Sequence, residues 1–220
     1  MDLKEFYSAF CIYFCKSHKL PSNVKSTVLQ LLTIIDSYNK NILKLSKEEN
    51  GEIEEITKKK HKESAIENPH FLAIFMGAKA EEIQENMIDK IEKYTKTTIN
   101  KKTLIKNELA IANHINFNFV FMDVYAAAFG MCVELSEKEE ISEEKEKFRK
   151  IEENLDKALC TEYSSLKVVV FTAINMTYNL KSEICENYQV SPEEVEMMSK
   201  TIEKYEIPSK TQVFEKYKSI

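Results

Sequence analysis

The sequence predicts an all-α fold. Only 3 glycines and 4 prolines punctuate its 220 residues, too few for the many turns of a β-rich chain. Leucine, glutamate, lysine and alanine, all good helix formers, recur at helical spacing along most of the chain. With a hydrophobic fraction of 43%, a chain of this length can bury a sizeable core as one domain or two small ones.

The first half of the chain predicts five helices. Apolar side chains at every third or fourth position indicate one helix over about Leu3–His18 and a second over Ser22 to about Leu43. Asn68 followed by Pro69 is typical of a helix start, and this helix should be the central one. A short helix over about Ala80–Tyr94 and a longer one over Lys101–Ile115 are expected next.

A charged stretch separates the second helix from the central one. Residues Leu45 to Glu67 carry many charges and few aromatic side chains, so we expect an exposed, mobile insertion outside the core. Its basic run, Lys58–Lys62, closely follows several glutamates, which favours a solvated loop over a nucleic-acid-binding patch.

The second half repeats the pattern in outline. We expect helices over Val124–Leu135, Ser142–Leu159 and Leu166–Tyr178, and a last helix that begins at Ser191–Pro192 and ends at Ile207–Pro208. The Leu166–Tyr178 helix is apolar nearly all round, like the central helix of the first half, which indicates burial on every side.

The spacing of these two apolar helices predicts an internal repeat. Phe75 and Phe171, near their middles, lie 96 positions apart. We therefore predict two similar five-helix units in tandem, over residues 1–121 and 122–220, with the charged insertion at about 45–67 in the first.

Two charged residues interrupt apolar helix segments. Lys79 ends the apolar run of the first central helix, and Glu108 falls on the Ile105, Leu109 and Ala112 stripe of the next long helix. Removing a charge from water without a partner is costly. Either these two residues find a partner inside the chain, or they face another protein.

Catalytic and metal chemistry are disfavoured. The glycines are isolated, so the chain has no phosphate-binding loop or dinucleotide fingerprint, and it has no nucleophile elbow. The five cysteines contain no Cys-x-x-Cys pair and the four histidines no His-x-x-x-His pair, which argues against disulfides and zinc. We expect core-packed cysteines in a reducing compartment, with no metal, no cofactor and no enzymatic activity.

The charge balance and the apolar pattern also limit the partners. A formal net charge of -5 gives no electrostatic basis for binding nucleic acid. The N-terminus does not read as a signal peptide, and no run approaches the ~20 apolar residues of a membrane span. We expect a soluble intracellular protein that binds neither membrane nor nucleic acid directly.

Several segments resemble the cyclin family. The run Ala78–Glu82 is similar to the end of the third helix of a cyclin box, and Glu108 falls where cyclins carry an acid on the fifth helix. Ile115–Phe119 resembles the exit of that helix. Two later segments resemble transcription-type cyclins. Met122–Tyr125 resembles the opening of the second box, and Glu203–Ser209 resembles a stretch near the end of the sequence in the cyclin H group.

The resemblance implies a fold, a function and a binding site. The fold would be two tandem five-helix cyclin boxes, and the protein would be a non-catalytic subunit that binds and activates a cyclin-dependent kinase. The matching positions imply a kinase-binding set of Lys79, Glu82, Ile83, Glu108, Phe117 and Phe119. The alternative is an internal Lys79–Glu108 salt bridge with both phenylalanines in the core.

The cyclin H group, which the sequence resembles most, implies particular partners and a nuclear location. They are the catalytic subunit of the CDK-activating kinase, a RING-finger assembly factor and general transcription factor IIH. The first helix lacks the Met-Arg-x-Ile-Leu docking motif of cell-cycle cyclins, and Val124 stands where transcription-type members carry proline. A cyclin C-like partner of the Mediator kinase, a DNA-associated cyclin-fold transcription factor and a helical scaffold are the alternatives.

Overall fold

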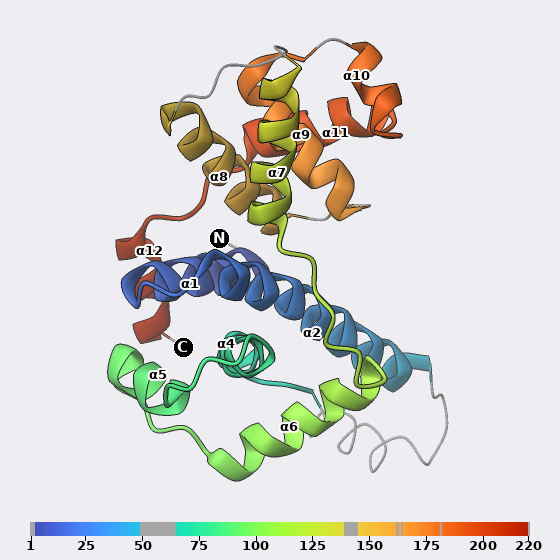
Figure 1. The fold of residues 1–220 in the computed structure, drawn as a ribbon. Helices are drawn as coiled ribbons and strands as arrows, with labels where there is room; N and C mark the ends of the chain where they lie inside the picture. Colours follow the sequence, from blue (N-terminus) through green and yellow to red (C-terminus); the bar gives the residue numbers. More distant parts are fainter. Residues whose placement is uncertain are drawn as a thin grey trace. The chain divides into compact units, whose positions relative to one another are not determined.

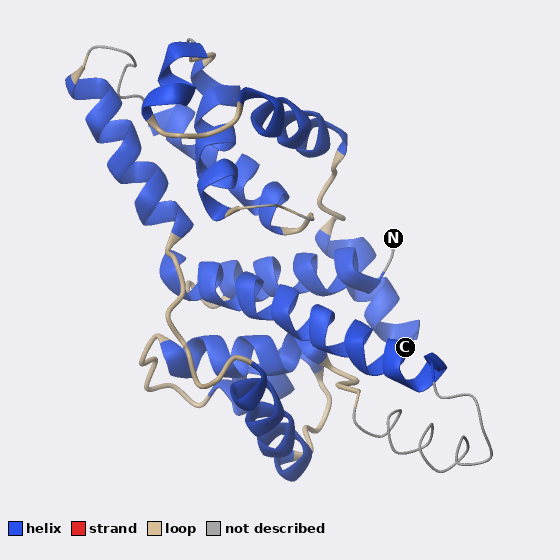
Figure 2. Cartoon of the chain, turned by 90° about the vertical axis from the view of Figure 1, so that its right-hand side faces the viewer, coloured by secondary structure: helices blue, strands red, loops and turns tan. Residues whose placement is uncertain are grey.

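The computed structural model describes residues 3–48, 65–138, 145–161, 163, 165–180 and 182–219. Over these residues every regular element is an α-helix and no strand occurs (Figure 2). This confirms the predicted all-α class. The chain divides into two compact units, one formed by Thr27–Val120 and the other by Met1–Ser26 together with Phe121–Ile220.

Helix α4 (Pro69–Ala80) is the centre of the unit Thr27–Val120. It packs against α5 (Met87–Thr95) and α6 (Lys101–His114) (Figure 1). Nine of its 12 residues are buried, as expected for a helix that is apolar nearly all round. The predicted buried central helix is therefore confirmed.

Helix α2 (Ser22–Glu48) is held against α4 by close packing and by one hydrogen bond to the residue that follows α4. A Cβ atom on Gly77 would lie 2.6 Å from Val28 Cγ2, so the glycine permits the approach of the two helices. Thr27 Oγ1 donates a hydrogen bond to Glu81 Oε1 at 2.5 Å. These contacts fix the end of α4, where Lys79 is located.

Helix α9 (Leu166–Tyr178) has the corresponding central place in the other unit. It packs against α7 (Val124–Glu137), α8 (Lys145–Leu159) and α11 (Pro192–Lys204). Seven consecutive residues, from Val168 to Ile174, are buried, so the second apolar helix is also a core element.

Helices α1 (Leu3–Ser17) and α12 (Lys210–Ser219) pack against each other within the same unit. The rings of Phe10 and Tyr217 stack with centroids 5.9 Å apart. The Tyr13 hydroxyl donates to the Pro208 carbonyl oxygen at 3.0 Å, which ties α1 to the segment that precedes α12.

A buried carboxylate joins four parts of this unit. Asp156 of α8 is 1% exposed and forms ion pairs with Lys25 Nζ at 2.7 Å and Lys16 Nζ at 2.8 Å. The Tyr125 hydroxyl donates to it at 2.6 Å, and Lys25 Nζ lies 4.1 Å from the Tyr125 ring centroid. Burial by itself raises the pKa of Asp156, but the two lysines outweigh it and hold the pKa below its ordinary value.

Two predicted helix boundaries in the first half are wrong. The helix expected over about Ala80–Tyr94 begins only at Met87, because α4 closes in a left-handed turn at Glu82 (φ 55°) and the Asn86 side chain caps the next helix by accepting from Asp89 N. The second helix continues beyond Leu43 to Glu48. Most of the predicted insertion, residues 49–64, lies outside the described residues.

The C-terminal region contains two helices that the sequence did not predict. They are α10 (Ser182–Asn187) and α12, and α11 ends at Lys204 rather than at Ile207–Pro208. The division into boxes at 1–121 and 122–220 stays a prediction. Of the two compact units, the one that contains the C-terminal part of the chain also includes residues 1–26.

Candidate functional site

The end of α4 fixes three of the predicted site residues in one turn. Ile83 N donates to Ala78 O at 2.9 Å and Glu82 N donates to Lys79 O at 3.1 Å, which is the hydrogen-bond pair of a Schellman motif. Glu82 takes the left-handed conformation that this motif requires, and its side chain is exposed. The motif therefore presents Glu82 and the half-buried Ile83 directly beside Lys79.

Lys79 and Glu108 form an ion pair between α4 and α6. The Lys79 side chain is 55% exposed and that of Glu108 is 21% exposed. Lys79 Nζ also lies 5.1 Å from the centroid of the Phe75 ring, within cation–π range. The two charges thus form the internal salt bridge of the alternative interpretation. Water and other molecules can still reach the lysine.

The apolar stripe around Glu108 faces outward for most of its length. Ile105 is 58% exposed and Leu109 is 55% exposed, and only Ala112 of the stripe is buried. The core contacts of α6 come instead from Leu104 and Ile111. Ile105 and Leu109, which were not among the predicted site residues, therefore add apolar surface beside the ion pair.

The exit of α6 repeats the turn seen at the end of α4. Phe117 N donates to Ala112 O at 2.7 Å and Asn116 N to Asn113 O at 3.0 Å, with Asn116 and Phe117 both at positive φ. Phe117 is 60% exposed and Phe119 is 36% exposed. Neither ring is in the core, so this part of the internal alternative is wrong.

We call the surface formed by these residues the α4–α6 face. Its sequence-predicted members are Lys79, Glu82, Ile83, Glu108, Phe117 and Phe119, and the structure adds Ile105, Leu109 and the 88% exposed Val120. All of them belong to the unit Thr27–Val120. Large apolar side chains exposed in one region are typical of a surface that binds another protein.

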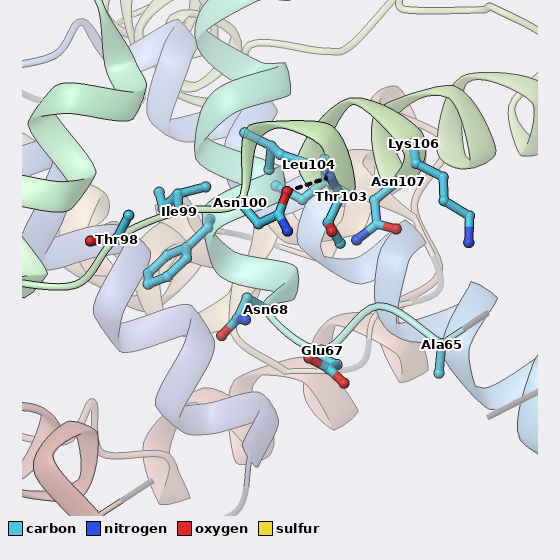
Figure 3. A pocket seen from close by; sticks show the side chains of 12 residues that line it. Ala65, Glu67, Asn68, Thr98, Ile99, Asn100, Thr103, Leu104, Lys106 and Asn107 are labelled. Carbon is cyan, nitrogen blue, oxygen red and sulfur yellow. Dashed lines mark hydrogen bonds between the residues drawn. The ribbon is translucent and has the colours of Figure 1, made fainter. Parts of the chain in front are cut away.

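A polar cavity of about 490 Å³ lies at the beginnings of α4 and α6 (Figure 3). The Asn100 side chain caps α6 by accepting from Lys102 N and Thr103 N. Asn68 precedes α4 as predicted, but its side chain makes no capping hydrogen bond. Asparagine and threonine side chains make up most of the polar lining, and Glu67 and Lys106 add one acidic and one basic group.

The thiol groups are packed in the core. All five cysteines are free and buried, which confirms the prediction that they act as small hydrophobic residues. Burial raises the pKa of Cys15 and of Cys160 to about 12, so both stay protonated and are poor nucleophiles or metal ligands at neutral pH.

The described residues offer neither a metal cluster nor a membrane-spanning helix. They contain no group of three or more histidine, cysteine, aspartate or glutamate side chains that could hold a metal ion. No helix in the described part of the chain has the length and apolar character needed to cross a membrane.

Comparison with known proteins gives a likeness in structure. No protein-family model matches the sequence, and comparison with curated proteins gave no match. A chain in the structure of the CAK complex from Chaetomium thermophilum bound to ATP-γ-S is similar, with a TM-score of 0.61 and 14% sequence identity. The alignment covers 98% of this chain, which spans only 65% of the length of the chain it matches.

This likeness concerns the fold. Each of the two compact units has one apolar, buried helix in its core, α4 in the unit Thr27–Val120 and α9 in the other. The similarity therefore shows that this chain shares an all-α fold with a chain of the CAK complex.

Proposed function

We propose that this protein is a cyclin-type regulatory subunit that binds and activates a cyclin-dependent kinase acting in transcription, as members of the cyclin H group do. The observation that carries the proposal is the α4–α6 face, where an exposed ion pair stands beside exposed apolar side chains. The cyclin-like fold and the sequence resemblance at these positions support it.

The face has the composition of a binding surface for a helix and the loop before it. Phe117, Ile105 and Leu109 are each more than half exposed, and burying such a side chain contributes roughly 1.5–3 kcal/mol before the entropic cost of association. Lys79 and Glu108 already hold each other in place, so the partner's polar groups meet charges that are oriented in advance.

Activation in this mechanism requires no chemistry from the cyclin-like chain. A kinase whose regulatory helix is displaced lacks the lysine–glutamate ion pair that positions ATP. A surface that binds only the helix-in state shifts the kinase population toward that state. A shift from 1% to 99% active requires about 5.5 kcal/mol of differential binding, which an interface of ~2,000 Å² can supply.

The binding test uses the ion pair. Lys79→Ala or Glu108→Ala should weaken the complex with the cognate kinase by about 2–5 kcal/mol, while the isolated protein loses less than about 1 kcal/mol of stability because the pair is exposed. Isothermal titration and urea unfolding measure the two quantities. Lys200→Ala is the matched control, since it breaks the exposed Lys200–Glu196 pair of α11, 2.5 Å long.

The activity test uses the whole protein. Neither this protein nor the kinase subunit alone should phosphorylate the repeated C-terminal tail of RNA polymerase II efficiently, and the mixture should do so faster by orders of magnitude. Loss of stability without loss of kinase affinity in the Lys79→Ala protein would contradict the proposed face. If the protein purifies with promoter DNA in place of a kinase, the DNA-associated alternative is favoured. If its partner is a Mediator kinase, the cyclin C-like alternative is favoured.

The proposal includes the location and the other partners. In the cyclin H setting the protein acts in the nucleus with a RING-finger assembly factor and general transcription factor IIH. Immunoprecipitation of the tagged protein from its own cells, followed by mass spectrometry, tests for these partners. Recovery of a different set of proteins would contradict this part of the proposal.

A further inference from the structure

A groove of about 280 Å³ lies on the other unit, between α7 and α9. Its walls are mainly apolar and include Met122, Met131, Val170 and Phe171. It contains no residue of the α4–α6 face, so its role is independent of the proposed function.

Gly130 opens the groove along α7. A Cβ atom built on this residue would have no neighbour within 4 Å, and the residue is exposed. A glycine inside a helix is less favourable than alanine by roughly 0.5–1 kcal/mol. No close packing among the described residues requires glycine here, in contrast to Gly77, so its effect is to leave the groove open.

The charges at the rim favour one sign of ligand. Glu134 is already paired with Lys138 at 2.5 Å. Burial, to which the nearby Glu134 adds, raises the pKa of Tyr188 to about 12. Lys167 is exposed and has no ion-pair partner among the described residues. The described part of the rim therefore presents one lysine without an ion-pair partner and one carboxylate that is already paired with a lysine.

The position of Lys167 in its helix also favours an anionic ligand. It is the second residue of α9, where its backbone N–H is capped by Ser165. A cation in the first turn of a helix opposes the helix dipole, and an anion would be stabilised there. A carboxylate brought to Lys167 would gain from both the lysine and the helix terminus.

We propose that the groove between α7 and α9 binds a short acidic–apolar segment of a partner protein, which inserts one apolar side chain beside Gly130 and places a carboxylate against Lys167. The volume suits one or two aliphatic side chains, and it is below the roughly 300–1,000 Å³ typical of pockets for drug-sized ligands. The two methionines supply adaptable walls for such a side chain.

The test uses the methionine methyl groups as reporters. The 220-residue protein, labelled with ¹³C at its methionine methyls, is titrated with the peptide acetyl-Asp-Leu-Leu-Asp-amide and followed by NMR. The signals of Met122 and Met131 should shift in a saturable manner, and that of Met197, which does not line the groove, should stay unchanged. The peptides acetyl-Lys-Leu-Leu-Lys-amide and acetyl-Asp-Ser-Ser-Asp-amide should cause no saturable shift.

Three variants identify the contacts. Gly130→Leu fills the open space and should abolish the shifts, whereas Gly130→Ala adds one methyl group and should retain binding. Lys167→Ala should weaken binding roughly tenfold, the loss expected for one charge-assisted hydrogen bond. An unchanged far-UV circular dichroism spectrum verifies that each variant is folded.

Three results would overturn the proposal: no saturable shift at millimolar acidic peptide, equal shifts with the basic peptide, or unaltered binding by folded Gly130→Leu protein.

Discussion

The carboxylate of Asp156 is held by two lysines and a tyrosine hydroxyl while its side chain is 1% exposed. Lys25, one of the two lysines, is itself only 11% exposed. Removing one partner of a buried ion pair leaves the other charge without compensation, and this loss is larger than the net gain from forming the pair.

We therefore predict that Asp156→Asn lowers the free energy of unfolding by about 3–5 kcal/mol. The control is Asp36→Asn, because Asp36 pairs with Lys40 on the surface of α2 at 2.9 Å with both side chains substantially exposed, and such a pair is worth less than about 1 kcal/mol. Urea unfolding followed by circular dichroism gives both values. Equal costs for the two variants would show that the Asp156 cluster is not a stabilising centre.

Single residues differ in how far the sequence can predict them. Lys79 and Glu108 were identifiable because a charge within an apolar run is a local pattern, and their pairing in the structure follows that pattern. Asp156 gave no such signal, because its partners Lys16, Lys25 and Tyr125 are remote in sequence and only the fold brings them together.

At the scale of elements, two glycines in helices have opposite roles. Gly77 of α4 faces Val28, where a Cβ atom would lie 2.6 Å from Cγ2 and 3.3 Å from the Val28 backbone. Gly130 of α7 has open space around the same position. Alanine is the better helix former at both sites, so packing decides whether each Gly→Ala substitution raises or lowers the free energy of unfolding.

We predict that Gly77→Ala destabilises the protein by about 1–3 kcal/mol, the usual cost of overpacking, and that Gly130→Ala stabilises it by roughly 0.5–1 kcal/mol. Thermal unfolding of both variants measures the difference. Adding Val28→Ala to Gly77→Ala should recover part of the loss, because the clashing methyl group is removed. A stabilised Gly77→Ala protein would mean that α2 and α4 are not in this close contact.

The elements that the sequence predicted best are those with a continuous apolar signal. The buried helices α4 and α9 were expected within about two residues of their observed ends. Helix α10 has only 6 residues, too few for a clear helical period. The start of α5 was misplaced because Glu82 takes a left-handed conformation that is uncommon for glutamate.

The site was only partly predictable for a related reason. A helical period shows that α6 has an apolar stripe, but it does not show which side of the helix the unit buries. The structure buries Leu104 and Ile111 and leaves Ile105 and Leu109 exposed. The sequence therefore shows the stripe and the charge within it, but not that Ile105 and Leu109 of this stripe are exposed.

For the whole molecule, a fold can persist while the sequence changes widely. This chain shares 14% identity with the CAK-complex chain that it resembles, at a TM-score of 0.61. Cores tolerate many substitutions when their volume and apolar pattern are kept. The sequence shows two apolar helices, and each becomes the buried helix of one compact unit. This pattern does not require identical residues.

The response of the whole molecule to acid should begin with one histidine. His70, in the first turn of α4, is 2% exposed, and its ring centroid lies 4.2 Å from that of Phe71. Burial lowers the pKa of His70 to about 3, whereas a histidine in the unfolded chain titrates near roughly 6.5. Between these values the unfolded state binds a proton that the folded state does not, so stability is complete above about 6.5 and falls as the pH decreases.

We predict that the free energy of unfolding falls by about 1.4 kcal/mol for each pH unit below roughly 6 because of this one residue. His70→Leu should flatten the curve between about pH 6 and pH 5. Asp156, whose folded-state pKa is lowered, should add a further loss only below about pH 4, where its unfolded-state carboxyl begins to bind protons, and this second loss should persist in His70→Leu. Urea unfolding at half-unit pH intervals separates the two steps, and parallel curves for the original and His70→Leu proteins above pH 5 would show that His70 does not control the acid response.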